Sequence, residues 1–246
     1  MSSCIRIVRT LATPTDLFRG AADEFIRLGR DLVAARGRFV VALSGGSTPR
    51  ALYSLLAKDY ADFSWSRTFL FFGDERHVPP DHPESNYRMV KEALLDKVSV
   101  PRTNVFRVQA ENPDAAAAAA DYELRIRNFF AVRETAVPTF DLILLGLGPD
   151  GHTASLFPDS DGLKEHSRLV VANWVEKFKT HRISFTYPLL NHAKDALFVV
   201  SGADKADILR DVLEGNHRPP YPAQLVEPQN RLMWMLDEAA ASKLSS

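Results

Sequence analysis

Four short polar segments of this sequence contain the residue types that bind anions and move protons. The segments span residues 44–49, 73–77, 146–152 and 201–205, and each follows directly after a run of apolar residues. Continuous apolar runs of about five residues are typical of strands buried on both faces. In parallel sheets, ligands bind in the crevice outside the carboxyl ends of the strands. We therefore expect the four segments to lie along one sheet edge and to form one site.

The first segment has the composition of a phosphate-binding loop. Ser44, Gly45, Gly46, Ser47 and Thr48 join a predicted strand to a predicted helix. Glycines let a backbone approach a ligand, hydroxyls donate hydrogen bonds, and a helix N-terminus presents free N–H groups. The segment is not a P-loop, because the Gly-Lys-Ser/Thr ending is missing. An ordinary tight turn, with Ser47 or Thr48 as the helix cap, explains the same residues about equally well.

The third segment contains a dinucleotide-binding pattern that we reject. Residues 146–151 read Gly-x-Gly-x-x-Gly after a predicted strand. The pattern also requires an acidic residue about 20 positions later, at the end of the next strand. The next apolar run ends in Asn173 instead, and Pro149 is foreign to a dinucleotide-binding helix. We therefore assign no dinucleotide to this loop.

The same segment offers a general base. His152 follows a predicted buried strand, and Asp150 stands two residues before it. Histidine has a reference pKa of roughly 6.5, so a histidine held by a carboxylate could accept a proton near neutral pH. The alternative is a loop histidine that only hydrogen-bonds to the backbone, which is the commoner case for any single histidine.

The second segment adds charge at the same edge. Asp74, Glu75, Arg76 and His77 come directly after the apolar residues 69–72. So many charged residues after such a strand indicate more than a solvated face, although Glu75 and His77 could simply point to water. His77 has no metal-ligand partner at a recognised spacing, so we expect no metal site.

Two further cations could bind a phosphate. Lys205 stands just before a predicted helix in the fourth segment, and Arg182 lies in the predicted strand at residues 181–187. A compact ammonium and a bidentate guanidinium would complement each other on a phosphate. Surface salt bridging is the simpler explanation for either residue alone.

The elements that position these residues alternate between strands and helices. Strands are predicted at residues 39–43, 68–72, 140–145, 181–187, 196–200 and 232–236. Helices are predicted at residues 14–36, 50–58, 86–97, from 112 through the alanine run, at 206–214, and at the C-terminus. This alternation predicts an α/β fold with a mostly parallel sheet covered on both faces. No linker interrupts the pattern, so we expect a single domain over residues 1–246.

Composition limits the compartment and the partners. The chain of 246 residues carries 30 basic and 31 acidic residues, which argues against nucleic acid or an anionic membrane as the main partner. Its one cysteine, Cys4, allows no intrachain disulfide and fits a reducing compartment. No apolar stretch reaches the ~18–20 residues of a membrane span, and the first residues do not read as a signal peptide. We expect a cytoplasmic protein that is a monomer or a weak homo-oligomer.

Three motifs of this sequence together resemble the 6-phosphogluconolactonases of the glucosamine-6-phosphate isomerase/6-phosphogluconolactonase family. They are Leu-Ser-Gly-Gly-Ser-Thr-Pro at 43–49, Phe-Gly-Asp-Glu-Arg at 72–76 with Ser-Asn-Tyr at 85–87, and Gly-Leu-Gly-Pro-Asp-Gly-His-Thr-Ala-Ser-Leu-Phe-Pro at 146–158. The likeness covers essentially the whole chain and ends with Gly-Ala-Asp-Lys at 202–205. The third motif is the most specific of the set.

The resemblance implies a Rossmann-like three-layer domain without an organic cofactor or an obligatory metal. It implies hydrolysis of 6-phospho-D-glucono-1,5-lactone to 6-phospho-D-gluconate in the oxidative pentose phosphate pathway. By motif, His152 becomes the base, Arg76 and Asp74 line the site, and residues 44–48 with Arg182 and Lys205 receive the phosphate. Either Asp74 or Asp150 would orient the base, and Arg76 would stabilise negative charge or position the substrate.

The main rival is glucosamine-6-phosphate deaminase, which shares the fold. Its loop reads Asp-Gly-His-Ile-Ala-Phe-Asn-Glu-Pro, in which the glutamate orients the histidine. Here Phe157 takes the position of that glutamate, and an aromatic ring cannot accept a hydrogen bond from imidazole as a carboxylate does. The departure favours the lactonase. A non-catalytic sugar-phosphate sensor would need no His152, and the DNA-binding appendage that usually accompanies it has no counterpart in this sequence.

Overall fold

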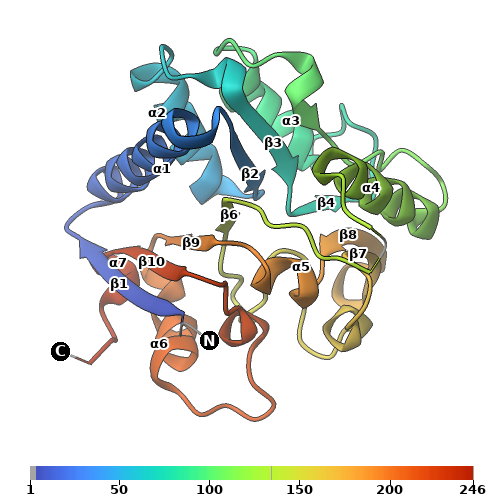
Figure 1. The fold of residues 1–246 in the computed structure, drawn as a ribbon. Coiled ribbons are helices and arrows are strands. Elements are labelled where there is room, and N and C mark those ends of the chain that lie inside the picture. The colour runs from blue at the N-terminus through green and yellow to red at the C-terminus, as the bar shows by residue number, and fades with distance from the viewer. Residues whose placement is uncertain (1–3, 134, 246) are drawn as a thin grey trace.

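The computed structural model describes residues 4–133 and 135–245, and its centre is a seven-stranded parallel sheet (Figure 1). In spatial order the strands are β1 (Ile5–Leu11), β10 (Arg231–Asp237), β9 (Asp195–Val200), β6 (Leu142–Leu145), β2 (Phe39–Leu43), β3 (Thr68–Phe72) and β5 (Val105–Phe106). Every neighbouring pair is parallel. All residues of β2 and β9 are buried. This explains the continuous apolar runs from which both strands were predicted.

Helices cover both faces of the sheet. One face is covered by α1 (Pro14–Arg36), α2 (Ser47–Asp59) and α3 (Asn86–Val90), which continues in a π-helical turn over Lys91–Leu95. The other face is covered by α4 (Ala115–Phe130), α5 (Tyr187–Asn191), α6 (Ala206–Glu214) and α7 (Glu238–Ala241). Successive side chains of a strand point to opposite faces, so Val41 packs in the first layer and Val40 in the second. The predicted three-layer α/β fold is confirmed.

A small antiparallel sheet lies beyond the carboxyl end of β3. It consists of β4 (Asp74–Arg76), β8 (Thr180–Phe185) and β7 (Val170–Val175), seen at the right of Figure 1. The sequence predicted β8, but residues 74–76 were expected as part of a polar loop. Pairing with β8 turns them into a strand, which places alternate side chains on opposite faces. This second sheet decides which residues after β3 face the site.

Several predicted helix boundaries agree with the structure. The side chain of Thr13 caps α1 by accepting the N–H of Asp16 at 3.1 Å, and Gly37 ends the helix at a φ of 76°. In contrast, α4 begins later than predicted, because the carboxylate of Asp114 accepts the N–H groups of Ala116 and Ala117. Short 3-10 turns lie at Trp65–Arg67, Arg102–Asn104, Asp161–Lys164, Glu176–Phe178, Ala203–Lys205 and Pro222–Leu225.

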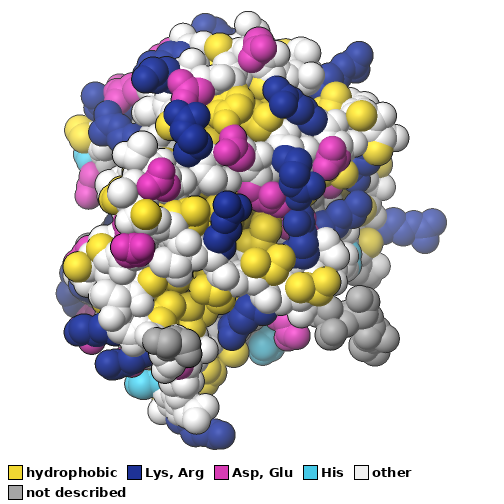
Figure 2. All heavy atoms as spheres, turned by 90° about the vertical axis from the view of Figure 1, so that its left-hand side faces the viewer, with side chains coloured by type: hydrophobic (Ala, Val, Ile, Leu, Met, Phe, Trp, Pro, Cys, Tyr) yellow, Lys and Arg dark blue, Asp and Glu magenta, His cyan; other side chains and the backbone are white. Residues whose placement is uncertain are grey.

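Figure 2 faces the side of the molecule that carries α1 and β1. Lys, Arg, Asp and Glu side chains are interspersed there with apolar ones. The apolar side chains of the edge strand include Ile5, Ile7 and Val8, all exposed. Among the residues that the structure describes, no helix is both long and apolar enough to span a bilayer.

Candidate active site

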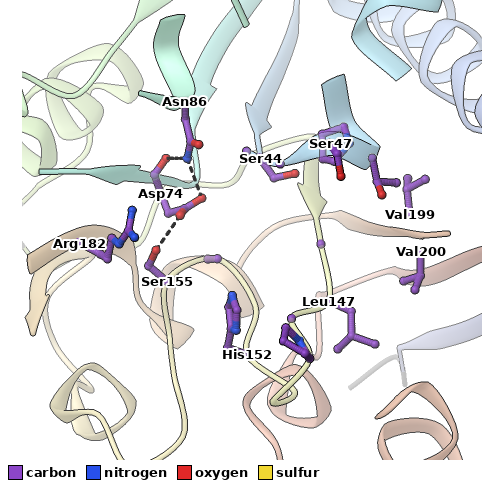
Figure 3. A pocket seen from close by; sticks show the side chains of 18 of the residues that line it. Ser44, Ser47, Asp74, Asn86, Leu147, His152, Ser155, Arg182, Val199 and Val200 are labelled. Carbon is purple, nitrogen blue, oxygen red and sulfur yellow. Dashed lines mark hydrogen bonds between the residues drawn. The ribbon is translucent and has the colours of Figure 1, made fainter. Parts of the chain in front are cut away.

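A cavity of about 300 Å³ lies at the carboxyl ends of the central strands, where the sequence predicted the site. All four polar segments contribute to its wall, so residues that are far apart in sequence become neighbours (Figure 3). The predicted residues that line it are Ser44, Gly45, Gly46, Ser47, Thr48, Asp74, Arg76, His152, Arg182 and Lys205. Asp150 does not line the cavity and lies behind His152.

The loop after β2 presents a free helix end to the cavity. Helix α2 starts at Ser47, and the cap residue is Gly46, with a φ of 109° and no side-chain cap. The alternative of Ser47 or Thr48 as the cap is therefore wrong. Behind the loop, the buried hydroxyl of Tyr53 accepts the N–H of Ser44 at 3.0 Å and donates to its C=O at 2.9 Å. The first N–H groups of α2 thus remain without side-chain acceptors, an arrangement suited to an anion.

A close contact with Asn86 explains why this loop contains Gly45. A β-carbon at Gly45 would lie 1.9 Å from Oδ1 of Asn86. The amide of Asn86 also donates to the backbone C=O of Asp74 at 3.0 Å (Figure 3). Asn86 therefore touches both the loop after β2 and the segment after β3.

His152 and Asp150 form a hydrogen-bonded pair. Nδ1 of His152 lies 2.5 Å from Oδ1 of Asp150, and the glycine at 148 leaves room for the ring, since a β-carbon there would be 2.0 Å from Nδ1. Burial raises the pKa of Asp150, but the hydrogen bond and charge of His152 outweigh it and lower the pKa to about 2. An ionised Asp150 can accept Nδ1–H of the imidazole, and in the neutral tautomer that keeps this proton the lone pair lies on Nε2.

One face of the His152 imidazole is covered by an aromatic ring. Phe157 stacks on His152 with ring centroids 4.0 Å apart, and Phe178 packs edge-on against Phe157 at 5.9 Å. Phe157 is nearly buried. Phe157, which stands where the deaminase loop has a glutamate, therefore restrains the histidine ring by packing and offers it no hydrogen-bond acceptor.

Asp74 is bound on the other side of the cavity from the His152 pair. Its Oδ2 accepts the hydroxyl of Ser155 at 2.7 Å, and its Oδ1 lies 3.4 Å from the amide nitrogen of Asn86 (Figure 3). Of the two carboxylates considered for orienting the base, only Asp150 contacts the imidazole. Ser155 and Asn86 were not predicted as site residues, although both stand in the quoted motifs.

Two guanidinium groups come from neighbouring strands. Arg76 of β4 and Arg182 of β8 are directly opposite each other in the antiparallel register. Burial and the charge of Arg76 lower the pKa of Arg182, and Nε of Arg182 is buried without a hydrogen-bond partner. Its guanidinium carbon lies 5.2 Å from the ring centre of Phe178. An unpartnered buried donor beside a cavity is available to an anionic ligand.

Of the remaining predicted residues, Lys205 lines the cavity, whereas His77 and Glu75 do not. The ammonium of Lys205 lies 3.7 Å from Asp204 and lines the cavity. His77 lies outside the cavity, and its Nε2 is 2.6 Å from the C=O of Asn112, so it does not join His152 in lining the site. Glu75 is buried and does not point to water. Across residues 4–133 and 135–245, no three His, Cys, Asp or Glu side chains gather to hold a metal ion.

The parallel sheet, and at the carboxyl ends of its strands a polar cavity lined by the free end of α2, three cations and His152, define an α/β protein of the three-layer type. The chain belongs to the family of glucosamine-6-phosphate isomerases and 6-phosphogluconolactonases, whose model matches residues 12–234. The resemblance seen in its motifs is thereby confirmed.

Relatives of similar length support this assignment. The 6-phosphogluconolactonase of Nostoc sp. is 39% identical over 98% of this chain and 99% of its own. The human 6-phosphogluconolactonase is 40% identical over 87% of this chain and 84% of its own. The solved 6-phosphogluconolactonase of Trypanosoma cruzi has a TM-score of 0.87 at 28% identity, covering 100% of this chain and 99% of its own. A monomeric glucosamine-6-phosphate deaminase has a TM-score of 0.79 at 21% identity, covering 96% of this chain and 99% of its own, and shares the fold.

Proposed function

We propose that the protein hydrolyses 6-phospho-D-glucono-1,5-lactone to 6-phospho-D-gluconate, with His152 as general base. The observation that carries the proposal is the pairing of Nδ1 with Asp150 at 2.5 Å, while the ring borders the cavity. This pairing leaves Nε2 free to take a proton from water. The relatives named 6-phosphogluconolactonase at about 40% identity support the same reaction.

In this mechanism, water adds to the lactone carbonyl while Nε2 of His152 accepts one of its protons. The carbonyl oxygen becomes negative, and Arg76 stabilises it or positions the substrate. When the intermediate collapses, the bond from the carbonyl carbon to the ring oxygen breaks. His152 returns the proton to that oxygen, which leaves as a hydroxyl. The step needs no covalent enzyme intermediate, no metal and no organic cofactor.

The phosphate of the substrate would occupy the part of the cavity next to residues 44–48. The first N–H groups of α2, Lys205 and the buried Nε of Arg182 supply its donors. Fixing the phosphate there holds the carbonyl near the water and lowers the entropic part of the barrier. Phosphorylated lactones are therefore the preferred substrates in this proposal.

The deaminase reaction fits the site less well. Phe157 stacks on the ring of His152 and provides no carboxylate to orient it. The orienting contact comes from Asp150 alone. We therefore propose lactone opening without deamination of glucosamine 6-phosphate.

The test is a coupled assay with freshly generated 6-phosphogluconolactone, corrected for spontaneous opening, beside a glucosamine 6-phosphate reaction. We expect rapid formation of 6-phosphogluconate and no ammonia release above background. Ammonia release at a rate that rivals lactone opening would overturn the assignment. Binding of 6-phosphogluconate without any turnover would indicate a sugar-phosphate sensor instead.

A further inference from the structure

Glu75 stands between two predicted site residues, Asp74 and Arg76, but its side chain does not reach the cavity. Only 2% of the residue is exposed, and the alternation along β4 directs it away from the side that lines the site. A buried carboxylate is costly unless hydrogen bonds compensate for the lost water. The hydrogen bonds of the Glu75 carboxylate therefore indicate which part of the structure it stabilises.

Glu75 binds the first backbone N–H groups of α3. Its Oε1 accepts the N–H of Asn86 at 2.7 Å, and its Oε2 accepts the N–H of Tyr87 at 2.8 Å. The hydroxyl of Ser85, the cap residue of α3, lies 3.2 Å from Oε2, and the N–H of Arg76 donates to Oε1 at 2.8 Å. Both carboxylate oxygens are thus used, and they join β4 to the start of α3.

The residue held most directly by this contact is Asn86. Its side chain lines the cavity, lies against Gly45 so closely that a β-carbon would overlap it, and donates to Asp74. Asn86 thereby bridges the loop after β2 and the segment after β3. Displacing the backbone of Asn86 by even a fraction of an ångström would change the spacing between the predicted phosphate loop and Asp74.

We propose that Glu75 is a positioning residue for the reaction, because its carboxylate holds Asn86 across the cleft between the phosphate loop and Asp74. The proposal rests on the proposed lactonase function. Glu75 touches neither substrate nor reacting atoms, and it acts through Asn86. If the role of Glu75 were only structural, its substitution would lower the stability of the protein, and the effect would not depend on whether Asn86 is present.

A double-mutant cycle distinguishes these roles. Glu75→Gln keeps the shape of the side chain but places an NH₂ group opposite N–H donors, and Asn86→Ala removes the bridge. We expect each single variant to lower kcat/KM about tenfold to a hundredfold, the range of a lost hydrogen bond to a charged group. Because both changes disrupt one bridge, the double variant should be no slower than the slower single variant.

Asp195→Asn is the matched control. Asp195 is also a buried carboxylate that binds neighbouring side chains, Asn230 and Arg231, but it lies at the amino end of β9, whereas the cavity lies at the carboxyl ends of the strands. We expect this variant to lose stability and to keep the kcat and KM of the wild type. Its turnover, together with that of the wild type, also tests the proposed function independently of Glu75.

The proposal is overturned if Glu75→Gln stays within twofold of the wild-type kcat/KM, or if the two losses multiply in the double variant. If Glu75→Gln does not fold, Glu75→Asp replaces it, since the shorter carboxylate keeps the charge and withdraws from α3. The same two outcomes decide the cycle with Asn86→Ala. Absence of turnover in the wild type would instead refute the lactonase function. Calorimetric titration with 6-phosphogluconate would then supply the binding affinities for the same double-mutant cycle.

Discussion

At the scale of single residues, the site combines the hydrogen-bonded pair of His152 and Asp150 with three cations, Arg76, Arg182 and Lys205. Asp150 contacts Nδ1 of His152 and Phe157 stacks on the ring, and both contacts restrain the imidazole. Arg182 adds a buried donor without a partner. In the proposed mechanism His152 would transfer the proton and the cations would bind the anion, and each proposed role is testable by its own substitution.

His152→Ala should lower kcat strongly and leave KM and the stability of the fold nearly unchanged. A positioned general base is typically worth about 100- to 10,000-fold in rate. The variant should also lose the acid limb of the pH–rate profile, because the group that must be unprotonated is gone. Steady-state kinetics over a pH series checks this, with His77→Ala as the control because His77 lies outside the cavity. A control variant that loses turnover while His152→Ala keeps it would place the base elsewhere.

Lys205→Ala should weaken the binding of phosphorylated substrate by about 1.5–3 kcal/mol, as for a lost hydrogen bond to a charged group. The reason is that Lys205 lines the cavity with only a distant contact to Asp204 at 3.7 Å. The measurement is KM for the phosphorylated lactone, compared with unphosphorylated gluconolactone. If the unphosphorylated lactone is an equally good substrate for the wild type, the phosphate contacts have been assigned to the wrong ligand.

The sequence identified the residues that line the cavity more completely than the contacts among them. The polar segments could be placed at one edge because each ends a buried strand. The choice between Asp74 and Asp150 required distances, since both stand at that edge. Asn86 and Ser155 act through bonds to Asp74, and this partnership depends on how β4 and α3 fold over the cleft. No local pattern contains that information.

At the scale of elements, prediction succeeded for strands with continuous apolar runs and failed for strands that are exposed, very short or polar. Strands β2 and β3 were predicted with their exact bounds from continuous apolar runs. Strand β1 was missed because it lies exposed at the sheet edge and Arg6 and Arg9 interrupt its apolar residues. Strand β5 has two residues, too few for a pattern, and β4 reads as polar because its partner β8 is distant in sequence.

The contact between α3 and the loop after β2 predicts a steric rescue. Gly45→Ala should reduce activity, because its β-carbon would overlap the side chain of Asn86. The three nearest atoms to that β-carbon all belong to Asn86. Adding Gly45→Ala to an Asn86→Ala background should therefore cause little further loss. Relative kcat/KM of the four proteins measures the effect, and equal losses in both backgrounds would contradict the contact.

At the scale of the whole molecule, Glu75 should make stability depend on pH. Burial raises its pKa from 4.5 to about 7, although three backbone N–H groups oppose the shift. The charged and titratable groups that interact electrostatically with Glu75 are Asp74, Tyr122, Arg107 and Arg182. Between pH 4.5 and 7 the folded protein binds this proton more tightly than the unfolded chain, so its contribution to stability falls as pH rises.

Glu75→Gln removes that titration. Relative to this variant, the wild type should lose about 3 kcal/mol of unfolding free energy between pH 4.5 and 7, the equivalent of the raised pKa. Urea unfolding of both proteins at several pH values measures the difference, in which groups common to the two proteins cancel. Parallel pH dependences would show that Glu75 does not titrate in this range.

The two apolar cores lie on opposite faces of one sheet, and this arrangement predicts that the chain unfolds as a single unit. Alternate residues of the same strands belong to each core, so neither core can open without exposing strands of the other. Trp65 lies in the core under α1, and Trp234 lies in the opposite core. With Trp174 replaced by Phe, the further variants Trp65→Phe and Trp234→Phe each leave one reporter. We expect the fluorescence transition of each variant in urea to have the same midpoint as the circular dichroism transition of that variant. A fluorescence midpoint that departs from the circular dichroism midpoint of the same variant would divide the chain into two units and refute the single domain that we propose for residues 1–246.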